Sequence, residues 1–169
     1  VVAPGGGGLA GADEVDAALG ARLGRSLVVA HEWLDVVPCP VAEVDETGSL
    51  RLVEVDAEGR EELGAPLAGA ELAWARQWWP AGESGARVEV GLSRDQAWAR
   101  MLDEWHPAAA VAIDYAHTAG SRPFAGTLAA YRDGETVLPV PDGAADITAH
   151  VAESMPMKLA VTFTAPWPV

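Results

Sequence analysis

The chain has 169 residues, half of them hydrophobic, which is enough for one domain with a sizeable core. Its formal net charge of −14 argues against nucleic acid as a partner, because phosphates require clustered Lys and Arg, and against an anionic membrane surface. Cys39 is the only cysteine, so no disulfide can form within the chain, and a reduced, cytoplasmic compartment is expected. No apolar run reaches the roughly 18 residues that a membrane-spanning helix needs.

Residues 1–26 are predicted to be a linker or remnant segment ahead of the domain. VVAPGGGG at Val1–Gly8 imitates the strand-then-glycine order of a phosphate-binding loop, but four consecutive glycines are more typical of a flexible linker. DEVDAALGARL at Asp13–Leu23 predicts a short helix, since acids at its start and an arginine near its end suit the helix dipole.

The apolar run Leu27–Ala30 predicts a first strand, which should end at His31 and Glu32. Asp35 follows one helical turn later. Spacing alone favours a functional strand end and an ordinary strand-to-turn junction equally.

A β-hairpin is predicted over Val41–Asp56, turning at Glu46–Ser49. Leu52-Val53 interrupts the alternation, as either a bulge or burial on both faces would. A second turn is expected at Glu58-Gly59. A helical stripe that Pro80 closes comes next. It consists of Leu72, Ala75, Trp78 and Trp79.

A strand at Arg87–Val90, a helix and a second strand at Ala108–Ile113 follow one another. Ser93 and Gln96 form a capping-box pattern at the start of the helix. The order strand, helix, strand favours an α/β fold with parallel pairing. The helix carries an apolar stripe of Ala97, Trp98, Met101, Leu102 and Trp105.

The remaining segments predict strands only. A hairpin is expected from Thr127–Tyr131 and Thr136–Val140 around the Asp133-Gly134 turn. Ile147–Val151 and Leu159–Thr164 are short apolar runs with strand-like alternation.

Three kinds of chemistry are open to these residues. Asp114, His117, Asp146 and His150 have the types of side chain that bind zinc, iron or manganese, although nothing in the spacing brings them together. Nucleophilic hydrolysis is disfavoured, because there is no G-x-S-x-G and Cys39 lies between two prolines without a nearby cation. Strand-end acids such as Glu32 and Asp114 could instead accept hydrogen bonds from a ribose, an amine or a guanidinium.

Three motifs resemble those of the MidA-like family. AHEWLDVVPCPV at Ala30–Val41 is similar to its N-E-F-F-D-A-L-P motif, and AIDYAH at Ala112–His117 to its D-Y-G-H. GTLAAYRDGETVLPVPDGAADITAHV at Gly126–Val151 is similar to its G-T-L-x-x-Y and P-G-x-x-D-I-T-A-H-V segment. His31 replaces the family's usual Asn, and Ala116 its usual Gly.

The resemblance implies an S-adenosylmethionine-dependent methyltransferase, similar to the mitochondrial complex I assembly factor that methylates arginine on a protein. It implies an α/β fold, a partial Rossmann-like class I sheet with a β-hairpin insertion. The resemblance covers Leu27–Ala152, so we expect a truncated domain over 27–152 and a C-terminal strand and tail over 153–169.

The site residues carried over from the motifs fall into three groups, with no metal ligand among them. As catalytic residues the resemblance implies Glu32, Asp35, Asp114 and His117; as cofactor-binding residues His31, Glu32, Asp114 and Tyr115; and as substrate-binding residues Asp146, Thr148 and His150.

The family's glycine-rich cofactor motif has no counterpart before Leu27. We therefore expect the chain alone to bind S-adenosylmethionine weakly or not at all, and a partner chain or a homo-oligomer to complete the sheet. The alternatives are a noncatalytic fragment or binding module, and a metal-binding, hydrolase-like site.

For the fold, we expect Leu27–Ala30 and Val111–Asp114 to be neighbouring parallel strands, with Glu32, Asp114 and His117 clustered at their carboxyl ends.

Overall fold

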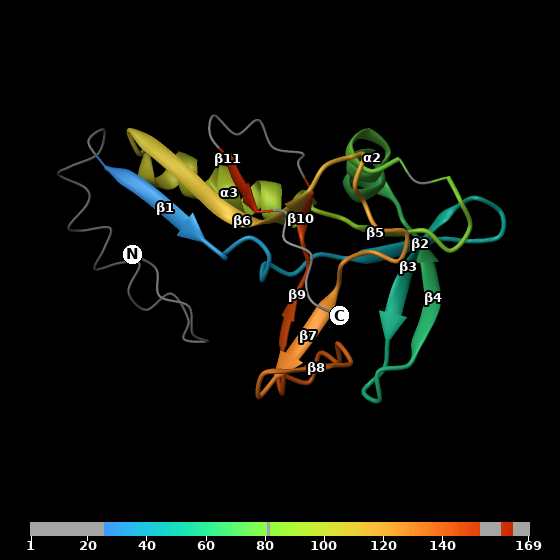
Figure 1. Cartoon of the computed structure of the whole chain (residues 1–169). Helices are drawn as coiled ribbons and strands as arrows, with labels where there is room; N and C mark the ends of the chain where they lie inside the picture. The colour runs from blue at the N-terminus through green and yellow to red at the C-terminus, as the bar shows by residue number, and fades with distance from the viewer. Residues whose placement is uncertain (1–25, 81, 153–159, 164–169) are drawn as a thin grey trace.

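A parallel sheet is built around one long central strand in the computed structural model, which describes residues 26–80, 82–152 and 160–163 (Figure 1). That strand is β6 (Ala109–His117), and β1 (Leu27–His31) runs parallel to it from Leu27 opposite Ala109 to His31 opposite Ile113. β10 (Val151–Ala152) and β11 (Ala160–Phe163) also pair with β6 in parallel. The predicted parallel neighbours and the partial Rossmann-like class are confirmed.

Helix α3 (Leu92–Trp105) covers one face of this sheet. Its apolar stripe packs on the strands because Trp98 and Met101 form one buried cluster with Leu34, Ala112 and Val151. The predicted capping box is wrong: the helix begins at Leu92 with Gly91 as its N-cap, and no side chain caps it. Ser93 Oγ instead donates to the carbonyl of Pro38 at 2.6 Å, which ties the helix start to the segment after β1.

An antiparallel sheet follows β1 in the chain, with strand order β4 (Glu61–Pro66), β3 (Leu50–Val55), β2 (Val41–Val44) and β5 (Arg87–Glu89). The predicted β2–β3 hairpin is confirmed, and the register shift between Arg51 and Val53 confirms the bulge. The Asp45 carboxylate holds the turn by accepting the backbone N–H groups of Thr47 and Ser49, each at 2.9 Å. The sequence did not indicate β4, whose acidic, glycine-containing run lacks strand alternation.

The pairing of β5 corrects a second expectation. β5 pairs antiparallel with β2, so the order β5, α3, β6 is a connection between two sheets and not a parallel crossover unit. Helix α2 (Gly69–Trp78) supplies the core of the antiparallel sheet. This core contains Ala42, Leu67, Trp74, Ala75, Trp79, Val88, Val90 and Ala152.

A third, small sheet has the order β8 (Glu135–Val137), β7 (Ala129–Arg132) and β9 (Asp146–Thr148). The predicted β7–β8 hairpin is confirmed. Its two turn residues, Asp133 and Gly134, have φ values of 53° and 80°, as a tight hairpin turn with the twist of the strands requires. The chain passes directly from β9 to β10, so this sheet stands beside the carboxyl end of β6 (Figure 1).

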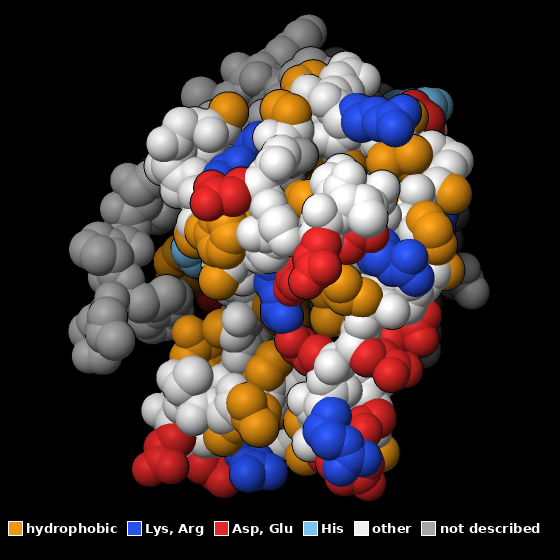
Figure 2. Space-filling model, turned by 90° about the vertical axis from the view of Figure 1, so that its right-hand side faces the viewer, with side chains coloured by type: hydrophobic (Ala, Val, Ile, Leu, Met, Phe, Trp, Pro, Cys, Tyr) orange, Lys and Arg blue, Asp and Glu red, His pale blue; other side chains and the backbone are white. Residues whose placement is uncertain are grey.

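The surface carries both charged and apolar side chains that partner molecules could contact. On the side of the molecule that shows the β2–β5 sheet, acidic and basic side chains are interspersed with apolar ones (Figure 2). On β1, Leu27 is 62% exposed and Val29 is 53% exposed. No helix within the described residues is long and apolar enough to cross a membrane. The helix predicted at Asp13–Leu23 lies outside the described residues.

Candidate functional site

The backbone turns sharply where β1 ends. Glu32 continues the pairing, because its N–H donates to the Ile113 carbonyl at 2.8 Å, yet its φ is 46°. A left-handed conformation is uncommon for a residue with a long side chain and persists where surrounding contacts enforce it. The Glu32 side chain is exposed at this position, at the carboxyl end of a parallel strand.

The Asp114 carboxylate supplies those contacts. Its Oδ2 accepts the backbone N–H groups of Trp33, Leu34 and Asp35 at 3.2, 2.9 and 3.3 Å. Its Oδ1 accepts the N–H of Tyr115 at 2.9 Å. Because both oxygens are engaged and the residue is only 9% exposed, Asp114 holds the turn in place from the neighbouring strand.

The electrostatic environment of Asp114 is mixed. Burial, and then the nearby charge of Asp35, raise its pKa to about 6, although the N–H groups of Leu34, Asp35 and Tyr115 act in the opposite direction. The backbone donors keep a carboxylate in a position where desolvation alone would neutralise it.

A pocket of about 230 Å³, here called the edge pocket, opens at these strand ends. Its lining consists of His31, Glu32, Ile113, Asp114 and Tyr115. The Tyr115 ring stacks on the His150 ring, with centroids 6.0 Å apart and an interplanar angle of 25°. The edge pocket therefore combines the exposed carboxylate of Glu32, the imidazole of His31 and the phenol ring of Tyr115.

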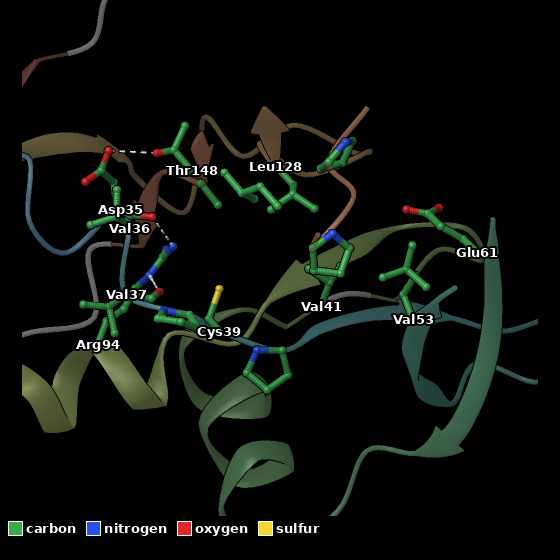
Figure 3. Close-up of a pocket in the computed structure, with 17 residues that line it drawn as sticks. Asp35, Val36, Val37, Cys39, Val41, Val53, Glu61, Arg94, Leu128 and Thr148 are labelled. Atoms are coloured by element: carbon green, nitrogen blue, oxygen red, sulfur yellow. Dashed lines mark hydrogen bonds between the residues drawn. The ribbon is translucent and has the colours of Figure 1, made fainter. Parts of the chain in front are cut away.

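A second cavity of about 380 Å³, here called the inter-sheet cleft, lies between the antiparallel sheet and the β7–β9 sheet (Figure 3). Valine and proline side chains provide most of its wall, among them Val36, Val37, Pro38, Pro40, Val41, Val53, Val55, Pro139 and Pro141. At one end Thr148 donates its hydroxyl to Asp35 Oδ2 at 2.8 Å. Cys39 also lines the cleft, and burial raises the pKa of its thiol, as expected for a structural cysteine.

Arg94 of α3 connects the segments that carry these groups. It is 2% exposed, and its guanidinium donates to the carbonyls of Asp35, Val37 and His150 at 2.9, 3.2 and 3.0 Å. One side chain thus connects the turn after β1 to the approach to β10. Figure 3 shows its contacts with the turn. A charge on the apolar stripe, four residues before Trp98, was the available sequence signal, and sequence reasoning missed it.

Glu89, the last residue of β5, connects segments in a similar way. Its buried carboxylate accepts the N–H groups of Thr127 and Leu128, the latter at 2.8 Å, and the Thr127 hydroxyl at 2.7 Å. Thr127 Oγ1 in turn accepts the N–H of His150 at 2.8 Å. No sequence pattern marks Glu89, since it lies inside a short apolar run.

The predicted cluster of Glu32, Asp114 and His117 forms only in part. Glu32 and Asp114 share the edge pocket, whereas His117 does not line it and packs edge-on against Trp79 at 4.6 Å. β6 continues beyond Asp114, and residues separated by an odd number on a strand face opposite sides of the sheet. The clustering of His117 is therefore wrong.

The predicted substrate-binding residues are also separated. Thr148 lines the inter-sheet cleft and the His150 ring lies against Tyr115, while Asp146 is exposed at the start of β9. Within residues 26–80, 82–152 and 160–163, no group of three or more His, Cys, Asp or Glu side chains is placed to hold a metal ion. The four residues of the metal hypothesis do not converge.

Residues 13–155 match the family described as "Putative S-adenosyl-L-methionine-dependent methyltransferase". This match spans well over half of the chain. The chain belongs to this methyltransferase family. No protein in the curated collection that was searched matches.

Two solved structures from Burkholderia thailandensis are similar to this member of the family. A COG1565 superfamily member bound to S-adenosyl-homocysteine is 26% identical with a TM-score of 0.58, over 76% of this chain and 35% of that chain. A native structure of a COG1565 superfamily protein is 23% identical with a TM-score of 0.56, over 76% and 36%, and this likeness shows the fold alone. The chain thus spans about a third of the length of these structures.

Proposed function

We propose that this chain takes part in S-adenosylmethionine-dependent methyl transfer, with the cofactor at the edge pocket. The observation that carries the proposal is the left-handed Glu32, which presents an exposed carboxylate beside the Asp114-bound turn at the carboxyl ends of β1 and β6. Ligands of open α/β sheets bind beyond the carboxyl ends of the strands. The family membership and the S-adenosyl-homocysteine bound to the similar structure support the choice of ligand.

The residues of the edge pocket fit such a cofactor in chemical type. The Glu32 carboxylate can accept hydrogen bonds from hydroxyl or amino groups, and Tyr115 offers a ring face. When bound, S-adenosylmethionine supplies a methyl group on a positively charged sulfur. Asp114 acts through the backbone as a positioning residue, because its own oxygens are occupied by N–H groups.

For the acceptor we propose an arginine side chain of a protein substrate, bound in the inter-sheet cleft. The arginine class rests on the resemblance to the MidA-like family. The aliphatic wall of the cleft suits the methylene groups of a long side chain, and the partly buried Asp35–Thr148 pair lies at the end of the cleft next to the turn after β1. Asp35 connects the two cavities, since its side chain lines the cleft while its N–H binds Asp114.

We also propose a partner chain or second copy that completes the sheet, and a cytoplasmic location. The exposed apolar side chains of Leu27 and Val29 on β1 support the first. The single free cysteine, Cys39, supports the second.

An NMR titration of the purified chain with S-adenosyl-homocysteine tests the cofactor site and detects weak binding. We expect saturable shifts at the backbone amides of residues 31–35 and 113–115. Glu32→Gln should weaken binding about tenfold, corresponding to about 1.4 kcal/mol. Glu46→Gln, an exposed acid in the β2–β3 turn, is the matched control and should bind as the wild type does.

Two outcomes would count against the proposal. Shifts that spare the turn after β1 would place the ligand elsewhere, and equal affinity of the wild type and Glu32→Gln would remove the role of the carboxylate. Complete absence of binding at millimolar ligand would favour the noncatalytic binding module.

A further inference from the structure

Buried nitrogen atoms without hydrogen-bond partners are concentrated around one tryptophan. Among the described residues, four buried side-chain polar atoms lack a partner, and three of them are His117 Nδ1, His117 Nε2 and Arg122 Nε. Both residues contact the Trp79 ring. Buried polar groups are nearly always hydrogen-bonded, so three such nitrogens at one place call for an explanation.

The geometry holds these groups in fixed positions. The Arg122 guanidinium carbon lies 4.9 Å from the centroid of the Trp79 ring, and the His117 ring meets that ring at 74° with 4.6 Å between centroids. Trp79 is 4% exposed and His117 is 3% exposed, so the core fixes both rings. A guanidinium held over an indole face keeps its N–H groups available at its edge.

The loop that carries Arg122 is also held at both ends. Thr118 N–H donates to Ser121 Oγ at 3.1 Å, and the carbonyl of Phe124 accepts the N–H of Arg87 at 2.9 Å. Arg122 therefore occupies a braced loop immediately after β6.

The charge balance of the cluster points to an anion. Acidic residues outnumber basic ones 25 to 11 in this chain, yet Arg122 forms no ion pair with any residue that the structure describes. Burial, and then the charge of Arg122, lower the pKa of His117 to about 4, so its ring is neutral at pH 7 with one N–H donor. Water could satisfy the imidazole, but only an anion would also neutralise the half-buried guanidinium.

We propose that Arg122 and His117, arranged around Trp79, form a binding site for a small oxyanion, a carboxylate or a phosphate group. The guanidinium supplies the charge and two donors, and the imidazole supplies one further donor. This site lies apart from the edge pocket, because Asp114 and His117 face opposite sides of β6. The proposal of an anion site does not depend on the proposed methyl transfer.

Titration of the chain at pH 7 with inorganic phosphate, and separately with sodium acetate, tests the site. Ionic strength is kept constant with chloride, and NMR follows the His117 ring and the Arg122 Nε–H. We expect a saturable change in both signals, and the probe with the higher affinity identifies the ligand as phosphate-like or carboxylate-like. Arg122→Gln should weaken binding at least tenfold. Arg122→Lys keeps the charge but lacks the planar fork, so its affinity should lie between those of the wild type and Arg122→Gln.

Arg132→Gln is the matched control, because Arg132 is an exposed arginine at the end of β7. It should bind phosphate and acetate as the wild type does. Since Arg122 is only half-buried, its variants are expected to fold, and the dispersion of the amide spectrum checks this. The proposal is overturned if neither anion binds saturably, or if folded Arg122→Gln binds as tightly as the wild type.

Discussion

Asp114 and His117 belong to the same strand and are both buried, but their surroundings differ completely. On the β1 side of β6, the Asp114 carboxylate accepts backbone N–H groups from Trp33, Leu34, Asp35 and Tyr115. Beside Trp79, neither ring nitrogen of His117 has a partner among the described residues. The first region is completed by the chain's own backbone, and the second leaves donors for something else to use.

This difference separates two uses of a buried polar side chain. A group with all its hydrogen bonds made within the chain stabilises a shape, here the turn that presents Glu32. A group without partners carries a cost of about 1–3 kcal/mol that folding alone does not recover, and a ligand can recover it.

The largest effect is expected from Asp114→Ala. It removes the acceptor of four backbone N–H groups in a buried site, so the free energy of unfolding should fall by about 3–5 kcal/mol. Urea unfolding measures the change. Asp146→Ala, an exposed acid on β9, is the control and should change stability by no more than about 0.5 kcal/mol. A similar loss in both variants would contradict the role assigned to Asp114.

Arg94→Met should have the next largest effect. It leaves the carbonyls of Asp35, Val37 and His150 without a donor, so we expect a loss of about 2–3 kcal/mol in thermal or urea unfolding. Arg94→Lys should recover part of this, since one ammonium can reach only some of the carbonyls. Arg100→Met, on an exposed position of the same helix, should be nearly neutral.

His117→Phe should change the pH dependence of stability. The folded-state pKa of His117, about 4, lies below its ordinary value of 6.5, so its contribution is present above pH 6.5 and lost as the pH falls toward 4. Relative to the variant, the wild type should gain stability from pH 4 to 6.5, by at most about 1.4 kcal/mol per pH unit for one proton. Urea unfolding at several pH values measures this difference.

Asp114 affects the pH dependence of stability in the opposite direction to His117, over nearly the same pH range. Its folded-state pKa of about 6 lies above its ordinary value of 3.8, so ionisation between these values lowers stability as the pH rises. The two groups therefore offset one another in the wild type, and His117→Phe should expose the downward slope. A variant profile parallel to that of the wild type would show that His117 does not titrate in this way.

The smallest effect on stability is expected from Glu32→Gly. Glycine adopts the left-handed φ of 46° without penalty, so the variant should be as stable as the wild type or more stable by up to about 1 kcal/mol. Binding of S-adenosyl-homocysteine should nevertheless weaken, because the carboxylate is lost. Glu32→Gln separates the two effects, since it removes the charge and keeps a side chain in the left-handed conformation.

Much of the fold was predictable from local pattern. The runs Leu27–Ala30 and Ala108–Ile113 are apolar and end in polar residues, and they are indeed parallel neighbours. Turn residues placed both hairpins, because the conformations at Gly48 and Gly134 are ones that few other residues adopt. β4 and the antiparallel pairing of β5 were not predictable, since short strands gain their stability from partners distant in sequence.

By itself, the amino-acid sequence determined the family, the parallel pair of strands and the residues at their ends, because these depend on apolar runs, turn residues and motif order. Only the tertiary structure decided what each polar side chain does. The Asp114 carboxylate accepts hydrogen bonds from backbone N–H groups, whereas the Glu32 carboxylate is exposed. This difference depends on segments about 80 residues apart in the sequence. The environment of His117 also depends on tertiary structure. Pairing with β10 extends β6 to His117, and the His117 ring then lies against Trp79. Hydrogen bonds and burial are properties of groups brought together in space, and the local sequence encodes them only where the partners are neighbours along the chain.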